Sequence, residues 1–122
     1  MTLQELYQQI GGSYEQAIHV MQMDKLVDKH IRKFPKNGVV EKLLEAGKSM
    51  DPVALFEGAH AMKGVCANLG LPSMAAAASE IAEEYRPGNT RHFSDAEVQE
   101  KLRKIQESYK IITDGIRQYE EG

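Results

Sequence analysis

His60 and Lys63 are the two residues of the chain whose types and spacing point most directly to chemistry. A neutral imidazole nitrogen is a nucleophile near neutral pH. On a helix, a lysine three residues later lies on the neighbouring surface and can reach an anion held on the imidazole. Phosphoryl transfer requires mainly in-line positioning and neutralisation of the phosphoryl oxygens. The pair therefore predicts a phosphoryl-accepting histidine with a lysine that screens the added charge.

Gly64 gives this pair an unusual neighbour. Glycine in a helix interior costs roughly 1 kcal/mol relative to alanine, and at this position it fills no core. It does remove side-chain bulk beside the imidazole. On a helical wheel of about 100° per residue, the face centred on His60 holds four further residues, which are Val53, Phe56, Glu57 and Ala67. Exposed apolar residues beside a reactive group predict a partner-binding surface.

The opposite face of the same helix is predicted to be buried. Its residues are Leu55, Gly58, Met62, Val65, Cys66 and Leu69. Asp51 and Pro52 predict where the helix begins, because aspartate caps free N–H groups and proline is tolerated in the first turn. Gly70 predicts where it ends. The wheel therefore turns His60 away from the core.

Six further helices are predicted from caps and apolar spacing. Three begin with the spacing of a capping box, at residues 2–5, 13–16 and 94–97. Asp24 is predicted to cap a helix that Pro35 ends, because the residue before proline avoids the helical region. Gly47 is predicted to end the next helix in a left-handed conformation. Pro72 begins another helix, and residues 86–93 form the clearest loop.

The last predicted helix has the most regular pattern. Its apolar residues alternate spacings of four and three, at Val98, Leu102, Ile105, Tyr109, Ile112, Ile116 and Tyr119. Such a seam packs against other helices, and no segment shows sustained strand alternation. We therefore predict an all-α fold, an antiparallel four-helix bundle with additional short N-terminal helices, in one domain spanning residues 1–122.

The composition of the chain excludes several classes of function. The net charge of −3, with both signs interspersed, disfavours nucleic-acid binding. The single cysteine fits a reducing compartment, no apolar run approaches the roughly 20 residues of a membrane span, and residues 1–5 do not resemble a signal peptide. We therefore expect a cytoplasmic protein without a membrane role. The chain has no nucleotide-binding loop and no acidic cluster for magnesium, so we expect no cofactor and no metal of its own.

The run Ala59–Gly70 closely resembles the core motif of histidine-containing phosphotransfer (HPt) domains. That motif reads His-x-x-Lys-Gly, then a short stretch, then Leu-Gly. Asp51 and Leu55 match the family's aspartate at the helix start and its leucine before the histidine. Residues 6–15, LYQQIGGSYE, are similar to the opening of small stand-alone bacterial members.

The resemblance implies that His60 accepts a phosphoryl group from an aspartyl phosphate on a response-regulator receiver domain and passes it to another receiver. One of these receivers can belong to a hybrid histidine kinase. Lys63 would screen the phosphate, Gly64 would let the receiver approach, and the receiver would supply Mg²⁺. The protein would act as a monomeric carrier, without kinase activity of its own.

Two departures from the family pattern stand out. Met62 replaces the usual leucine, a volume-conserving change in a core position. Many members carry a glutamine that faces the histidine from the next helix, and the matching position here is Ala82. A supporting hydrogen bond to His60 from that position is therefore not expected.

Two alternative functions remain open from the sequence. One is a helical interaction module that has lost phosphotransfer. The other is a metal-binding bundle, since Glu57 and His60 form the Glu-x-x-His pair of di-iron proteins, although those sites need a second copy and face inward. A local basic group is interpreted as a solvated face, or as a surface that steers an acidic receiver. It consists of Lys29, Arg32, Lys33 and Lys36.

Overall fold

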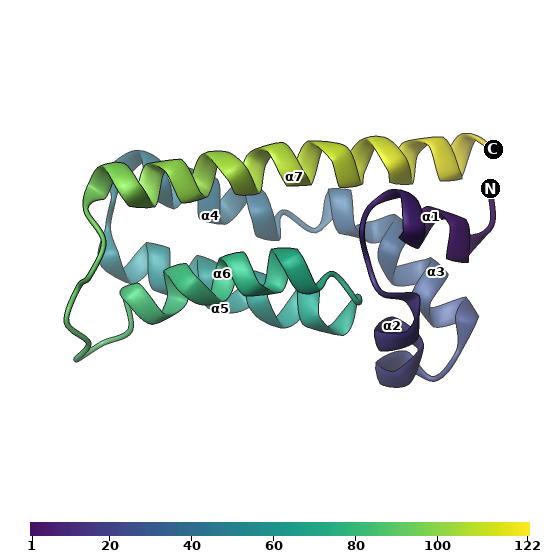
Figure 1. The fold of residues 1–122 in the computed structure, drawn as a ribbon, viewed down its shortest axis with the longest axis horizontal. Helices are drawn as coiled ribbons and strands as arrows, with labels where there is room; N and C mark the ends of the chain where they lie inside the picture. The colour runs from purple at the N-terminus through teal and green to yellow at the C-terminus, as the bar shows by residue number, and fades with distance from the viewer.

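The computed structural model describes all residues, 1–122, and contains seven α-helices and one 3₁₀ helix (Figure 1). In chain order they are α1 (Leu3–Gln9), α2 (Tyr14–Met21), α3 (Asp24–Lys33), the 3₁₀ helix η1 (Phe34–Lys36), α4 (Val39–Ser49), α5 (Pro52–Asn68), α6 (Pro72–Glu84) and α7 (Asp95–Glu121). No strand is present. The predicted all-α class is confirmed.

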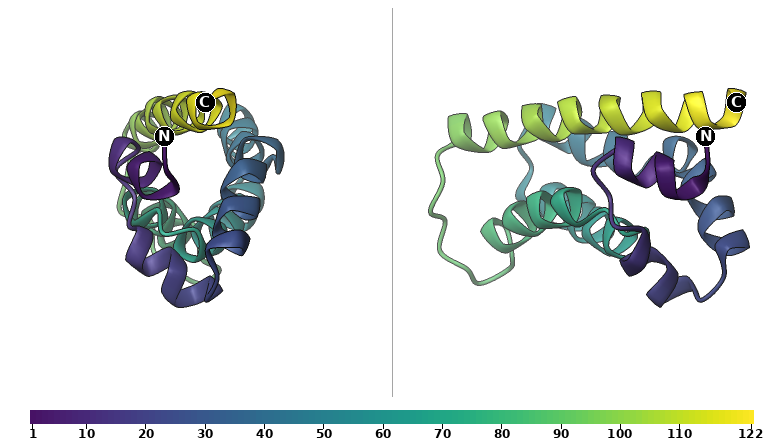
Figure 2. Two further views of the ribbon diagram at one scale, coloured as in Figure 1. Left: turned by 90° about the vertical axis from the view of Figure 1, so that its right-hand side faces the viewer. Right: turned by 45° about the vertical axis from the view of Figure 1, so that its right-hand side comes forward.

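Helices α4 to α7 form the antiparallel four-helix bundle, and the short N-terminal helices extend it at one end. Figures 1 and 2 show α7 running along the whole molecule, over α4–α6 in one half and over α1 and α3 in the other. Helices α5 and α6 form a closely packed hairpin, with α4 against α5. The α2–α3 pair projects beyond the α5–α6 layer on the side away from α7.

The core is a single cluster of 27 buried apolar residues drawn from every α-helix. The predicted seam of α7 faces this core, since its five aliphatic residues are buried. Its two tyrosines are half-buried and donate hydrogen bonds outward, Tyr109 to Glu41 at 2.9 Å and Tyr119 to Asp28 at 2.5 Å. Every predicted seam position therefore contributes to packing of α7.

The predicted caps are confirmed at two of three helix starts. Complete capping boxes form at Thr2–Glu5 and Ser94–Glu97. At α2, the Ser13 hydroxyl accepts a hydrogen bond from the Gln16 N–H at 3.1 Å, but the Gln16 amide donates to the Ala67 carbonyl oxygen at 3.0 Å instead of returning to the cap. A tertiary contact to α5 therefore replaces half of this box.

Two predicted helix boundaries are wrong. Asp24 is the first residue of α3, and Met23 occupies the cap position without a side-chain hydrogen bond. Gly47 does not end α4 but lies buried inside it, where an added Cβ would lie 2.5 Å from Leu102 Cδ1. The left-handed end is supplied by Met50, with φ 58°. Close packing against α7, rather than turn geometry, explains glycine at position 47.

Pro35 ends α3 less abruptly than expected. Phe34 keeps helical dihedral angles, φ −52° and ψ −45°, and the chain continues as the 3₁₀ turn η1. Phe34 is completely buried. Core packing of this side chain therefore outweighs the local preference of a residue before proline for an extended conformation.

The loop between α6 and α7 is held by Glu84, the one buried charged residue. One of its carboxylate oxygens accepts hydrogen bonds from the N–H groups of His92 and Phe93 and from Arg91 Nε, at 2.8, 2.7 and 3.2 Å. Burial alone would raise the pKa of Glu84, but these hydrogen bonds outweigh burial and hold the pKa below its usual value. The loop is therefore fixed by a buried, charged side chain that binds it through three hydrogen bonds.

A membrane-crossing helix, which must be both long and apolar, is absent from the structure.

Candidate functional site

Helix α5 begins and ends where the sequence predicts. The Asp51 carboxylate accepts a hydrogen bond from the Ala54 N–H at 3.0 Å, and a proline follows in the first turn. At the other end, Gly70 has φ +72°, and the Leu71 N–H donates to the Cys66 carbonyl oxygen at 2.9 Å. This pairing is a Schellman end, which needs a left-handed residue and so favours glycine.

The N-terminal helices hold the C-terminal end of α5. Three carbonyl oxygens at this end accept hydrogen bonds from residues more than 50 positions earlier in the chain. Tyr7 donates to Leu69, Gln16 to Ala67, and the Ser13 N–H to Gly70. Desolvation raises the pKa of the buried Tyr7 hydroxyl. The C-terminal end of the helix that carries His60 is thus anchored by the N-terminal helices.

The two predicted faces of α5 are separated by burial. On the core face, five of the six predicted residues are buried and Val65 is half-buried. Ala59 is also completely buried, although the wheel assigned it to neither face. On the opposite face His60, Lys63, Gly64, Glu57 and Val53 are exposed, with Val53 at 63%, and Phe56 and Ala67 are half-buried. The residues of the predicted site therefore share one outward surface.

The imidazole of His60 lies against the ring of Phe56, one helical turn earlier. The ring centroids are 5.7 Å apart and the planes are inclined by 19°, which is a stacked arrangement. Neither His60 nor Lys63 takes part in any side-chain hydrogen bond or salt bridge of the protein. Ala82 is buried at 5% exposure and offers only a methyl group. Both reactive side chains are therefore available to a partner.

Gly64 borders open space. A Cβ added there would meet no atom within 4 Å, and the backbone φ is negative. The glycine is therefore required neither by close packing nor by a left-handed conformation. Because side chains on a helix lean towards its N-terminus, a long side chain at position 64 would extend towards His60.

Cys66 is buried on the core face, as predicted. Desolvation raises the pKa of its thiol to about 12, so the reactive thiolate is scarce at neutral pH. The other histidines belong to other segments of the chain. His19, His30 and His92 are exposed, and His92 Nδ1 lies 3.9 Å from a carboxylate oxygen of Glu84.

No three His, Cys, Asp or Glu side chains converge as a metal site would need. Glu57 and His60 lie on the exposed face of α5 rather than inside the bundle. The di-iron alternative needs further ligands from other helices, all facing inward. The pair therefore lacks the surroundings of that kind of site.

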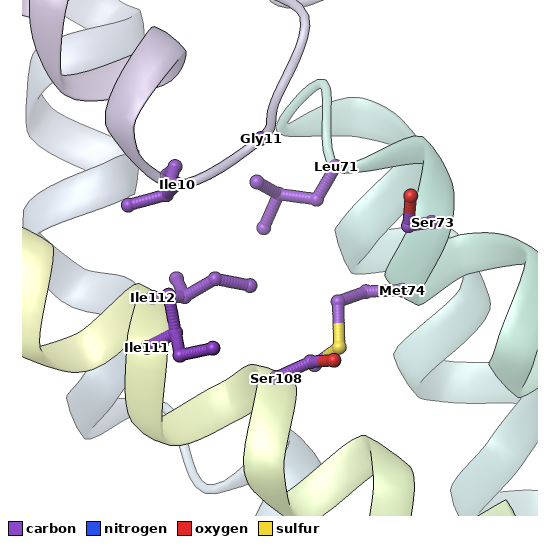
Figure 3. Close-up of a pocket in the computed structure, with 8 residues that line it drawn as sticks. All are labelled: Ile10, Gly11, Leu71, Ser73, Met74, Ser108, Ile111 and Ile112. Carbon is purple, nitrogen blue, oxygen red and sulfur yellow. The ribbon is translucent and has the colours of Figure 1, made fainter.

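A groove and a cavity lie apart from His60. The groove, of about 520 Å³, runs between α2, α3 and the C-terminal half of α5. The cavity shown in Figure 3, of about 200 Å³, lies where α1, α6 and α7 meet. Ile10, Leu71, Met74 and Ile112 point into it, and no residue of α5 lines it. Only the groove therefore adjoins the helix that carries His60.

The predicted basic group divides into two parts. Arg32 makes contacts within the protein, because its guanidinium lies 3.0 Å from Asp28 and 4.8 Å from the ring centre of Tyr119. Lys29, Lys33 and Lys36 are exposed and form no salt bridge. Lys33 also lines the groove.

The fold and the site define a class of protein: an antiparallel helical bundle that presents a histidine, a lysine and a glycine clearing on the surface of one anchored helix. The chain matches the Hpt domain family over residues 35–109, more than half of its length, and it belongs to that family. Hpt domains carry phosphoryl groups on histidine in two-component signalling and interact with response-regulator receiver domains. No curated protein and no solved structure matches the chain.

Sequence reasoning placed Phe56 on the correct face but missed its contact with His60. The signal was present, since residues four apart on a helix meet and both side chains are aromatic. It also missed the Glu84 anchor, because nothing local marks that glutamate as buried.

Proposed function

We propose that His60 is the phosphoryl acceptor and that the protein carries the group between two receiver domains. The observation that supports this best is the exposure of His60 beside Lys63 and Gly64 on a helix whose other face is core. Membership in the Hpt family gives the reaction class.

The reaction needs a nucleophile, a leaving group and charge neutralisation. A neutral nitrogen of His60 attacks the phosphorus of an aspartyl phosphate in line. The N–P bond forms while the P–O bond to the aspartyl carboxyl breaks, and the electron pair leaves with that carboxylate. The reverse step, onto a second receiver, breaks the N–P bond and forms a new acyl phosphate.

Lys63 and Gly64 assist in different ways. The Lys63 ammonium neutralises part of the charge on the phosphoryl oxygens. The bare surface at Gly64 lets the acidic site of the receiver approach the imidazole. The receiver supplies the Mg²⁺ that neutralises the remaining charge. Val53, Glu57 and Ala67 complete the contact surface around the imidazole.

The test is phosphorylation by receiver domains charged with acetyl phosphate. The wild-type protein should acquire a label that is lost in acid and retained in base. His60→Gln should acquire none, while its melting temperature and helical content stay at wild-type values because the side chain is exposed. Full labelling of His60→Gln would refute the assignment.

A further inference from the structure

Phe56 provides the specific ring contact of the imidazole. Its ring lies 5.7 Å from that of His60 and nearly parallel to it. No side-chain hydrogen bond or salt bridge holds His60. Ala82 occupies the position that matches the glutamine of many Hpt proteins, and its side chain has no hydrogen-bonding group. The stacked phenyl ring on the same helix is therefore the interaction within the protein that bears on the plane of the imidazole.

The stacked geometry suits a nucleophile. The lone pair of an imidazole nitrogen lies in the plane of the ring, so a ring stacked on one face leaves the attacking edge open. An edge-to-face contact at the nitrogen would cover it. Stacking at 19° thus restrains rotation of the imidazole without blocking its nitrogen.

We infer that Phe56 is a positioning residue for phosphoryl transfer, an inference that rests on the proposed function. It holds the imidazole plane so that a nitrogen meets the phosphorus in line. Aromatic pairs of this kind shift a conformational equilibrium by a factor of about 2 to 10. Loss of the ring should slow transfer by that factor.

One measurement needs no receiver. In NMR spectra, ring current from Phe56 should shift the ring protons of His60 upfield in the wild type and in Phe56→Tyr. Phe56→Leu should return them to the values of a free histidine. Identical His60 shifts in all three proteins would overturn the inference.

The second measurement separates positioning from docking. Phe56→Leu keeps apolar bulk for a receiver but removes the ring. Its maximal transfer rate should fall about 2- to 10-fold with an unchanged half-saturating receiver concentration, and Phe56→Tyr should restore the rate. A raised half-saturating concentration at an unchanged maximal rate would make Phe56 a docking residue only. Failure of wild-type labelling would refute the proposed function, whereas the NMR contact would persist.

A different observation carries a second inference. The groove between α2, α3 and α5 has an apolar lining that includes Val20 and Leu26, with His30 and Lys33 among its polar lining residues. No carboxylate lines it. Val20 is 47% exposed although it is aliphatic. The groove thus combines apolar surface with the positive charge of Lys33, which complements an apolar side chain beside a carboxylate.

Its position relative to His60 fits one occupant. Asn68, at its border, follows His60 by eight residues, which is about 12 Å along the helix. Asn68 also lies about 80° around the helix from His60. A standard interface of about 800 Å² per partner spans roughly 30 Å, so the edge of a receiver centred on His60 falls at the Asn68 border of the groove. The α2–α3 pair also projects beyond the α5–α6 layer on the side away from α7 (Figure 2). These helices precede the segment that matches the family.

The structure assigns this groove as a docking site for an acidic, apolar-tipped surface of the receiver that exchanges phosphoryl groups with His60. Receiver binding would be measured in the His60→Gln background, where no transfer occurs. Val20→Asp and Lys33→Glu should each weaken binding several-fold, the second less so at high salt. The matched controls are Ile111→Asp, an exposed aliphatic residue at the other cavity, and Lys104→Glu on α7.

Equal binding by all four variants would overturn the groove assignment while His60 labelling still supported the proposed function. Weakening by the control variants alone would move the docking site to α7. Self-association of the wild type that Val20→Asp abolishes would make a second copy the occupant instead.

Discussion

Gly58 and Gly64 lie six residues apart on α5, about 120° apart around the helix, and Gly58 is buried whereas Gly64 is exposed. A Cβ added at Gly58 would lie 3.2 Å from Leu43 Cα, so this glycine lets α4 and α5 pack closely. A Cβ added at Gly64 would meet nothing. Both residues weaken the helix by roughly 1 kcal/mol relative to alanine. Of the two, only Gly58 has a compensating contact inside the molecule, whereas Gly64 has none, as the proposed access of a receiver would require.

The largest expected effect is on transfer in Gly64→Gln. Its side chain would extend towards His60 and displace an incoming aspartyl phosphate, and a misplacement of about 1 Å costs about 100-fold in rate. The protein should melt at or above the wild-type temperature, because no internal contact is lost. A time course of phosphoryl transfer, paired with a thermal melt, checks both statements. Wild-type transfer by a normally folded Gly64→Gln would show that the clearing has no docking role.

Gly58→Leu should act in the opposite sense. Overpacking against the backbone of Leu43 should reduce the free energy of unfolding by about 1–3 kcal/mol, measured by urea denaturation. At a temperature where the variant remains folded, its transfer rate should stay near that of the wild type. The comparison between the two glycines would fail if Gly58→Leu were as stable as the wild type.

Lys63→Ala should slow transfer without preventing labelling. A charge-assisted hydrogen bond of roughly 1.5 kcal/mol corresponds to about tenfold in rate, and the receiver carries the rest of the neutralising charge. Lys104→Ala, also exposed and without a salt bridge, is the matched control. Equal rates for both variants would make Lys63 an ordinary solvated lysine.

The smallest expected effect is the difference in stability between the variants Gly64→Ala and Gly58→Ala. Gly64→Ala should raise the free energy of unfolding by up to about 1 kcal/mol, because it gains helix propensity without a clash. Gly58→Ala should gain less or lose stability, since Leu43 Cα is close. An equal increase in the free energy of unfolding at both positions would mean that α4 shifts at little cost to accommodate the methyl group at position 58.

The sequence was sufficient for the features that depend on local rules. The limits of α5, the burial of Leu55 and Met62, and the outward position of His60 follow from caps and a period of 3.6 residues. Gly47 and Gly58 show where such reasoning stops. Each occupies a place where another helix comes close, and a helix crossing leaves no mark in the local pattern.

The candidate site was predicted more completely than its supports. Its outward residues share one helix, so their relative placement follows from spacing alone. The contacts of Tyr7 and Gln16 with the end of α5 join residues more than 50 positions apart. Gln16 was assigned only to a local capping box and Tyr7 to no contact, and the fold reveals that both anchor the helix that carries His60.

Modification of the Cys66 thiol would measure transient local opening of the protein around α5. With no exposure and a thiol pKa of about 12, it cannot react with a disulfide reagent in the closed protein. Modification must wait until α5 detaches from its neighbours, so the labelling rate counts those openings. Because this is the only thiol, the modification rate reports on openings that expose α5 alone. A bound receiver that stabilises α5 in its packed position would slow modification of the thiol. The modification rate of this buried residue would therefore report whether a receiver is bound on the exposed face that carries His60.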